Sequence, residues 1–171
     1  MTGHANSDNQ SATKIIDKEG KYLTFLLADE EYGISILKIK EIIGMMTITT
    51  IPQAPPYMKG VINLRGKVIS VIDLRLCFQI EARAYNERTC IIVVEITDGS
   101  TILHVGLVVD AVSEVVHVKG ADIEPPPQFG AQVDTDYILG MAKTDVGVKI
   151  LLDIDKILNA EEISTFGTGD E

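Results

Sequence analysis

The sequence predicts a mainly β protein made of two small five-stranded β-barrels in tandem, closed by a short C-terminal helix. Three observations favour this fold class. Aromatic residues make up 5% of the chain and Trp is absent, so Val, Ile and Leu must build the core, and these residues favour strands. They occur in short runs separated by Gly, Pro and Asp. The order of these runs is repeated in the second half of the chain.

The first half contains the runs expected for one barrel. Its strand-like segments are residues 22–27, 32–34, 47–51, 60–64 and 67–72. The last two segments flank Arg65 and Gly66, which predicts a hairpin with a tight turn.

The second half follows the same order. Its strand-like segments are residues 89–96, 101–118, 137–141 and 148–152. We expect a turn at Asp98-Gly99 and a break in the long run near Asp110-Ala111. Residues 153–163 are expected to form the closing helix, with Ile154, Ile157 and Leu158 on one face.

The similar order of the halves indicates an internal repeat. Residues 57–60 (YMKG) match residues 137–140 (YILG), and Asp73 matches Asp153 at the same offset. Earlier in each half, the segment from Gly33 to Ile42 matches the segment from Gly106 to Val115.

The repeat also bears on residues 36–43, whose apolar spacing fits either a helix or a strand. The second copy, residues 108–118, is too rich in β-branched residues to make a comfortable helix. We therefore expect a strand, a kink and a second strand in this part of the first copy.

Each copy is a small unit that removes exposed strand edges by curling into a barrel. We expect a folded part over residues 19–160, with the first barrel at about 19–85 and the second at 86–160. The sequence leaves open whether the barrels exchange strands. Residues 1–18, rich in Ser, Asn, Asp and Gly, are expected to form a flexible tail, and residues 161–171 a C-terminal tail.

Charge and composition exclude several classes of partner. The formal net charge of −10 disfavours binding to nucleic acid and to anionic membrane surfaces. No apolar run is long enough to cross a membrane, and the N-terminus lacks a signal peptide. Cys77 and Cys90 are expected to be free thiols in a reducing compartment. These features predict a soluble, cytoplasmic protein.

No group of residues predicts catalysis, a metal site or a cofactor. His4, His104 and His117 lie in separate segments without a partner at metal-ligand spacing. No nucleophile elbow, Walker loop or CxxC motif occurs. Asp153 and Asp155 could act as paired carboxylates, but helix capping is the role we expect for them.

The most unusual segment is the hairpin of residues 60–75, GVINLRGKVISVIDLR. Arg65 at its tip is held rigidly and faces outward. One reading is a solvated turn residue. The other is a preorganised donor in a binding interface, because the planar guanidinium is enriched at interface centres.

This segment closely resembles the hallmark segment of CheW-like domains. Two further blocks, EEYGISILKIKEI at residues 30–42 and GLVVDAVSEV at residues 106–115, resemble other parts of the same family in the same order. The resemblance covers about residues 19–160, and it implies a CheW-like domain of two SH3-like β-barrels enclosing a groove. Ser70 replaces a Pro that is common in this hairpin of the family.

The resemblance also implies a function and a set of binding residues. A stand-alone domain resembles the non-enzymatic protein that couples chemoreceptors to the chemotaxis histidine kinase. Its partners would be the cytoplasmic hairpin tip of the receptor and the regulatory domain of the kinase, at membrane-associated arrays. The receptor-binding residues carried over to this chain are Ile39, Glu41, Asn63, Arg65 and Val115, with Ile39 in place of a Val. The resemblance assigns no kinase-binding residues.

Two alternatives stay open at this point. The chain could be an adaptor of a chemosensory-like pathway that controls an output other than swimming. It could also be a small-molecule sensor or enzyme, because β-barrels can hold ligands. Small five-stranded barrels are filled by their own side chains, which argues against the second alternative.

Overall fold

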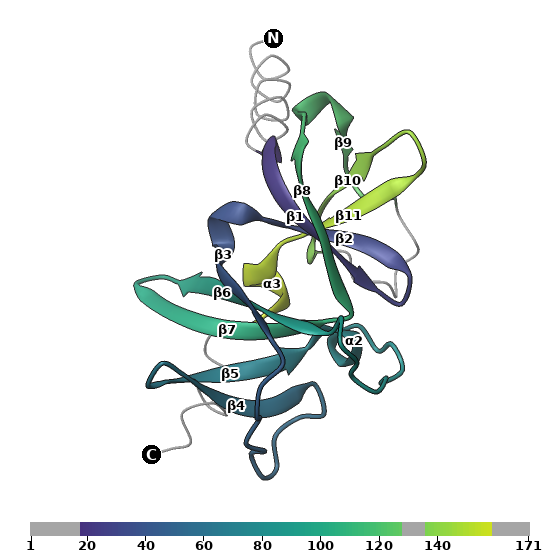
Figure 1. Cartoon of the computed structure of the whole chain (residues 1–171). Coiled ribbons are helices and arrows are strands. Elements are labelled where there is room, and N and C mark those ends of the chain that lie inside the picture. The colour runs from purple at the N-terminus through teal and green to yellow at the C-terminus, as the bar shows by residue number, and fades with distance from the viewer. Residues whose placement is uncertain (1–17, 128–135, 159–171) are drawn as a thin grey trace.

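The computed structural model describes residues 18–127 and 136–158, arranged as two β-sheets with only short helices (Figure 1). The prediction of a mainly β fold is confirmed. Closure of either sheet into a barrel stays a prediction. The expected tails, residues 1–18 and 161–171, lie outside the described residues except for Lys18.

Sheet A, in the upper part of Figure 1, has six strands. In spatial order they are β8 (Ala111–Val118), β1 (Gly20–Leu27), β2 (Glu30–Ser35), β11 (Val148–Leu152), β10 (Ile138–Lys143) and β9 (Ile123–Glu124). Sheet B, in the lower part, has five. These are β3 (Ile39–Gly44), β6 (Cys90–Asp98), β7 (Thr101–Val109), β5 (Lys67–Asp73) and β4 (Met58–Leu64). The strands β3 and β8 are therefore edge strands of their sheets.

The two halves of the chain exchange hairpins. The β1–β2 hairpin belongs to the sheet that contains β8 to β11, and the β6–β7 hairpin belongs to the sheet that contains β3 to β5. Each exchanged hairpin joins its new sheet by a parallel pairing: Gly33 of β2 lies opposite Leu151 of β11, and Gly106 of β7 lies opposite Val71 of β5. Residues 19–85 and 86–160 thus each contribute strands to both sheets.

The repeat seen in the sequence is also a repeat of structure. If β3, β6, β7, β5 and β4 are matched to β8, β1, β2, β11 and β10, the spatial order is the same in both sheets. Register shifts fall between Met58 and Gly60 in one copy and between Ile138 and Gly140 in the other. The same symmetry appears in the backbone, where Asp73 N donates to Tyr57 O at 2.8 Å and Asp153 N donates to Tyr137 O at 2.8 Å.

The chain crosses between the sheets at two points, and the sequence predicted both breaks. The first crossing is the 3₁₀ turn η1 (Ile36–Lys38), which follows the end of β2 at Ser35 and leads directly into β3 at Ile39. The second crossing is Asp110, a bend between β7 and β8. The expected turn at Asp98-Gly99 is confirmed, because β6 ends at Asp98 and β7 begins at Thr101.

A largely buried ion pair holds the second crossing in place, and it was not predicted from the sequence. Arg75 lies in helix α2 (Leu74–Cys77), and its Nε and Nη2 donate to the two carboxylate oxygens of Asp110 at 2.8 and 2.7 Å. Asp110 also accepts from the backbone N–H of Ala28 at 2.9 Å. Burial alone would raise the pKa of Asp110, but the hydrogen bonds from Arg75 and Ala28 outweigh it and lower that pKa.

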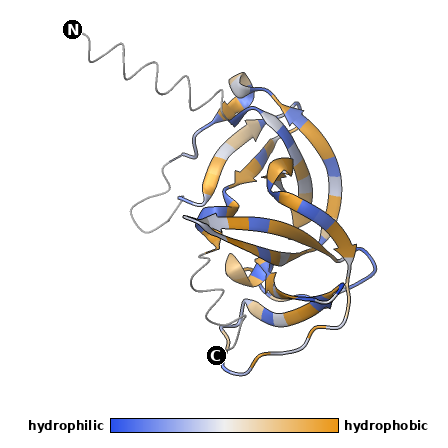
Figure 2. Cartoon of the chain, turned by 90° about the vertical axis from the view of Figure 1, so that its left-hand side faces the viewer, coloured by the Kyte–Doolittle hydropathy of each residue, from blue (hydrophilic) through white to orange (hydrophobic). Residues whose placement is uncertain are grey.

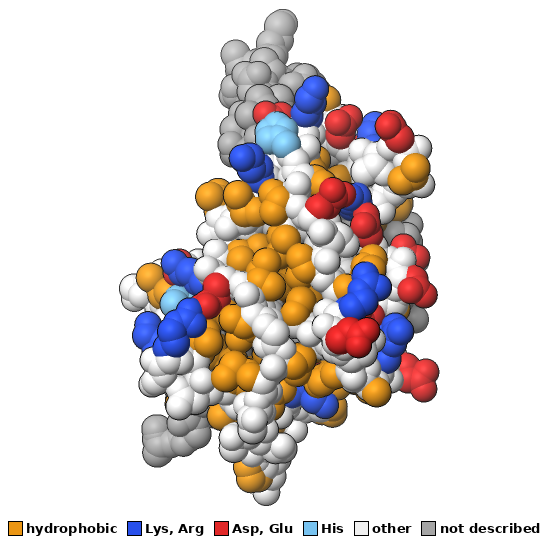
Figure 3. Space-filling view, viewed as in Figure 1, with side chains coloured by type: hydrophobic (Ala, Val, Ile, Leu, Met, Phe, Trp, Pro, Cys, Tyr) orange, Lys and Arg blue, Asp and Glu red, His pale blue; other side chains and the backbone are white. Residues whose placement is uncertain are grey.

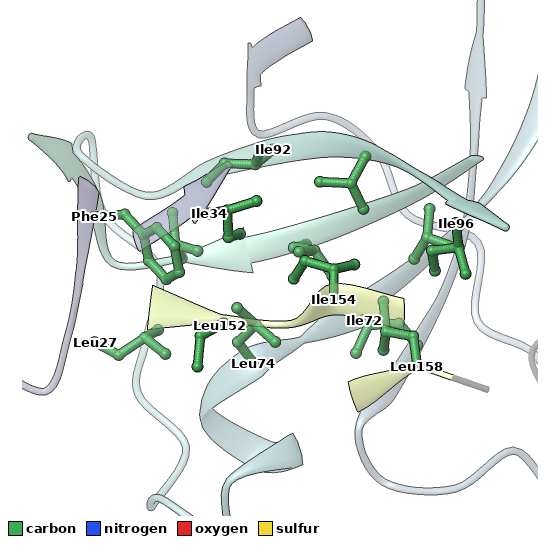
Figure 4. Close-up of a cluster of buried hydrophobic side chains, with 14 of the residues drawn as sticks. Phe25, Leu27, Ile34, Ile72, Leu74, Ile92, Ile96, Leu152, Ile154 and Leu158 are labelled. Carbon is green, nitrogen blue, oxygen red and sulfur yellow. The ribbon is translucent and has the colours of Figure 1, made fainter. Parts of the chain in front are cut away.

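Three apolar clusters fill the structure, and strand alternation explains them (Figure 2). The largest, here called the central cluster, joins the two sheets. Its buried members are Leu23, Phe25, Leu27, Ile34, Met58, Ile72, Leu74, Ile92, Val94, Ile96, Val105, Leu107, Val109, Leu152, Ile154 and Leu158. Figure 4 shows side chains from β1, β2 and β11 meeting those from β5 and β6. Smaller clusters lie on the other face of each sheet, around Val93 and Val71 in sheet B and around Tyr22 and Leu151 in sheet A.

The C-terminal helix corrects one expectation. Helix α3 covers Ile154–Ile157, and the predicted extension beyond Leu158 lies outside the described residues. The expected capping by both aspartates is wrong. Asp153 precedes the helix without a capping hydrogen bond from its side chain. Asp155 lies in the first turn of the helix, but its carboxylate pairs with Lys38 of η1 and accepts from Thr97 N at 3.1 Å.

The exchange of hairpins can be tested by cutting the chain between residues 85 and 86. We expect each fragment alone to lack a cooperative melting transition and a dispersed amide spectrum, because each lacks a hairpin that completes its sheet. Mixing the fragments should restore the spectrum of the intact chain, measured as the control. A fragment that folds alone as a monomer would contradict this topology.

Candidate functional site

The structure brings three of the five predicted binding residues together at one hairpin tip. Arg65 lies in the turn between β4 and β5, and its Nη2 pairs with both carboxylate oxygens of Glu41 on β3, the strand at the opposite edge of sheet B. Asn63 stands one residue before the end of β4, and its side-chain oxygen accepts from Gly66 N at 2.8 Å. Asn63 therefore shapes the turn, while Arg65 and Glu41 form the exposed polar part of the site.

The local sequence explains why this tip is rigid. Arg65 and Gly66 have φ of 52° and 87°, the positive values that a two-residue hairpin turn requires at both central positions. The Arg65 side chain is 68% exposed and that of Glu41 is 28% exposed. An exposed ion pair of this kind contributes about 0–1 kcal/mol to stability. The pair is therefore better suited to orienting charged groups at the surface than to holding the fold.

Ile39 does not share a face of β3 with Glu41, although they are two residues apart. A bulge places three residues of β3 against two of β6, so that Ile39 lies opposite Val94 and Glu41 lies opposite Val93. Val94 belongs to the central cluster, whereas Val93 belongs to the cluster on the other face of sheet B. Ile39 accordingly packs against the central cluster, and Glu41 points to the opposite side.

The two predicted apolar residues, Ile39 and Val115, lie on a surface between the two edge strands. This surface, here called the β3–β8 face, is made of Ile39, Ile42, Val112 and Val115. Ile42 lies opposite Ile92, and Val115 lies opposite Leu23, so both point to the side of the central cluster.

Two residues of this face are open to solvent. Ile42 is 45% exposed and Val115 is 54% exposed, while Ile39 and Val112 are half-buried against the central cluster. Figure 3 shows hydrophobic side chains gathered across the centre of this side of the molecule, between β3 and β8.

The β3–β8 face is built symmetrically by the internal repeat. The offset that matches Gly33 with Gly106 also matches Ile39 with Val112 and Ile42 with Val115. The reasoning from sequence named only Ile39 and Val115, one from each pair. The missing partners, Ile42 and Val112, could have been found by carrying the repeat offset through both strands.

Several other titratable groups in the described part of the chain are paired with one another. Around a cavity of about 80 Å³, Tyr85 OH donates to Asp73 at 2.9 Å, and Arg75 is bound to Asp110. His104 lies 3.5 Å from Glu95, which also pairs with Lys40 at 3.0 Å. The hydrogen bond from Lys40 is the main cause of the lowered pKa of Glu95. Within residues 18–127 and 136–158, no three His, Cys, Asp or Glu side chains gather as metal ligands do.

Two further findings concern the cysteines and the helices of the described residues. Cys77 and Cys90 are half-buried and are not joined in a disulfide, and burial raises the pKa of the Cys90 thiol. None of the helices in the described segments has the length and apolar character needed to span a bilayer. His4 lies outside the described residues.

Comparison with known proteins places this arrangement in a family. The model of the CheW-like domain matches residues 21–162. The chain is 40% identical over 144 residues to the chemotaxis protein CheW of Klebsiella aerogenes, which covers 84% of each chain. It is 30% identical over 144 residues to protein FrzA of Myxococcus xanthus, covering 82% of this chain and 86% of that relative.

A solved structure agrees with the same assignment. The scaffolding protein TtCheW from Thermoanaerobacter tengcongensis matches with a TM-score of 0.74 and 38% sequence identity, over 84% of this chain and 95% of that one. Together with the family match over residues 21–162, this shows that the chain belongs to the CheW-like domain family.

Proposed function

We propose that this chain is a non-enzymatic adaptor that couples chemoreceptors to the chemotaxis histidine kinase. The observation that carries the proposal is the β3–β8 face, an open apolar surface between two edge strands with a rigid Arg65–Glu41 pair at its border. Relatives at 30% identity and above include a chemotaxis protein CheW, and a matching structure is that of a scaffolding protein. Both names fit a protein that works by binding.

On the receptor, the partner is the tip of the hairpin that the receptor's cytoplasmic helices form. An amphipathic helix buries its apolar face on a complementary apolar surface, and full burial of one aliphatic side chain contributes about 1.5–3 kcal/mol. Ile42 and Val115 have the most to gain, because about half of each side chain is still exposed. Glu41 lies on β3 directly beside Ile42 but points to the other side of this edge strand, so the guanidinium of Arg65 that it holds supplies directional hydrogen-bond donors at the edge of this contact.

On the kinase, the partner is the regulatory domain, which would dock on a surface of this chain away from the β3–β8 face. A candidate is the outer end of sheet B, where Val68 is 69% exposed and Ile102 is 62% exposed. These side chains line one shallow cleft at the start of the parallel strands β5 and β7. Two modest interfaces on one small protein are enough for a tight ternary assembly, because binding of one partner raises the effective concentration of the other.

The proposal has two further parts: the chain catalyses no reaction, and it acts at a particular place in the cell. In the polar cluster around Arg75 and Asp110 the charged groups bind one another, and they face a cavity of about 80 Å³. The adaptor would act in the cytoplasm, at arrays of membrane receptors. A related adaptor role with an output other than swimming stays the alternative proposal.

A pull-down with the full chain tests the proposal. Immobilised protein is offered a receptor cytoplasmic fragment and the kinase together and separately. We expect capture of each partner alone and of both together. Failure to capture either partner would overturn the coupling role. If the kinase is captured but the receptor fragment never is, the β3–β8 face has no receptor ligand.

Replacing Arg65 with Ala is expected to weaken receptor binding without unfolding the protein. The side chain is exposed, so the free energy of unfolding should change by about 0.5 kcal/mol or less. Receptor affinity should fall by roughly tenfold, the value of one charge-assisted contact at an interface. Melting curves and titration with a receptor fragment measure the two quantities. A large drop in melting temperature, or unchanged affinity, would refute the role of Arg65.

The two binding surfaces are expected to be separable. Val115→Asp and Ile42→Asp place a charge on the β3–β8 face, which should weaken receptor binding by about 3 kcal/mol, roughly 100-fold, and leave kinase binding nearly unchanged. These positions are chosen over Ile39, which packs against the central cluster and whose replacement would threaten the fold.

Val68→Asp is the matched control on the other surface, also an exposed valine on a strand. It should weaken kinase binding and spare receptor binding. Both affinities are measured by titration after circular dichroism has confirmed folding. Equal loss of both affinities in Val115→Asp would mean one shared surface, and the two-interface adaptor would have to be abandoned.

A further inference from the structure

Because the β3–β8 face is symmetric, its apolar residues alone do not determine the direction in which a ligand lies across it. Ile39 and Ile42 on β3 are matched by Val112 and Val115 on β8, with similar exposure and the same orientation toward the central cluster. A rod-like ligand such as a helical hairpin could therefore lie across this face in either of two opposite directions with nearly equal apolar contact. Something outside the apolar residues must select one direction.

The two matching hairpin tips differ in charge. The pairing of Asn63 with Val68 in one copy corresponds to the pairing of Lys143 with Val148 in the other, so the two hairpins have the same register. At this offset the place of Arg65 is taken by Asp145. Figure 1 shows the β4–β5 tip at the lower left of the molecule and the β10–β11 tip at the upper right, with β3 and β8 between them.

The side chains around the two tips extend this difference. Near the β4–β5 tip, three cations accompany two carboxylates: Arg65, Lys67 and Lys40 with Glu41 and Glu95. Near the β10–β11 tip, two cations accompany five carboxylates: Lys143 and Lys149 with Glu30, Glu31, Glu114, Glu124 and Asp145. Figure 3 shows the same imbalance, with Lys, Arg and His side chains dominating one border of the apolar band and Asp and Glu frequent along the other.

We propose that the opposite charges of the two hairpin tips, Arg65 at one end and Asp145 at the other, select the direction in which the receptor hairpin lies across the β3–β8 face. This inference rests on the proposed function. The ligand is an amphipathic helical hairpin that carries its more acidic end toward Arg65 and its less acidic end toward Asp145. The reversed direction brings like charges together at both ends, which disfavours it.

The direction can be read by paramagnetic relaxation. A recombinant cytoplasmic fragment of a chemoreceptor is given one nitroxide label at its hairpin tip, and excess label is removed before mixing with the full, isotope-labelled chain. The amides of Gly66 and Gly147 report on the two tips of the adaptor. For the wild type we expect strong line broadening at one glycine, and a preference between the two directions of about tenfold or more.

Charge exchange should reverse the result. In the double variant Arg65→Asp with Asp145→Arg, the broadening should move to the other glycine. Asp is tolerated at the positive φ of residue 65. In the neutral double variant Arg65→Gln with Asp145→Asn, both glycines should be broadened to a similar degree. Salt at 1 M should erase the wild-type preference, because the charges are exposed and are then screened within about 3 Å.

The matched control exchanges two exposed charges elsewhere at unchanged net charge, Lys119→Asp with Asp122→Lys, and should keep the wild-type direction. If the wild type binds and the direction is the same in all variants, the inference is overturned while the proposed function stands. If the wild type does not bind the fragment at all, the proposed function falls and the inference falls with it. Amide spectra of the free variants establish that each one is folded.

Discussion

The exchange of hairpins between the two halves is the constraint on which the rest of the structure depends. Parallel pairing of β2 with β11 and of β7 with β5 makes each sheet incomplete without a hairpin from the other half. Gly33 leaves room for the side chain of the partner strand β11, since a Cβ there would come within 2.9 Å of Leu151. Gly106 leaves room for β6, on the other side of β7, since a Cβ there would come within 2.7 Å of Ile91. The central cluster then locks the sheets together, so that β3 and β8 are held as fixed edges of a single body.

The position of the β3–β8 face is a consequence of where the chain crosses between sheets. The 3₁₀ turn at residues 36–38 delivers β3 to the edge of sheet B, and the bend at Asp110 delivers β8 to the edge of sheet A. Each crossing is held by an ion pair to another element: Lys38 of the first crossing binds Asp155, which also accepts from Thr97 N, and Asp110 of the second crossing binds Arg75. A preorganised apolar surface loses little entropy on binding, which suits an adaptor whose affinity depends on small contacts.

Local sequence was sufficient for features that depend on neighbouring residues. The turn at Arg65-Gly66 and the break at Asp110 follow from turn chemistry and strand patterning. The kink expected within residues 36–43 needed the internal repeat as well, because the local apolar spacing fits either a helix or a strand. Long-range features were not accessible in this way. Alternation places Ile39 and Glu41 on one face, and only pairing with β6 creates the bulge that separates them. Arg75 resembles any surface cation in the sequence, because its partner Asp110 is 35 residues away.

The central claim is that the β3–β8 face is where the receptor hairpin binds. Methyl chemical shifts of Ile and Val residues, followed while a receptor cytoplasmic fragment is titrated into the full chain, test it most directly. We expect the largest shifts at Ile42 and Val115, smaller ones at Ile39 and Val112, and almost none at Val68 and Ile102. Shifts concentrated at Val68 and Ile102, with Ile42 and Val115 unchanged, would contradict the claim.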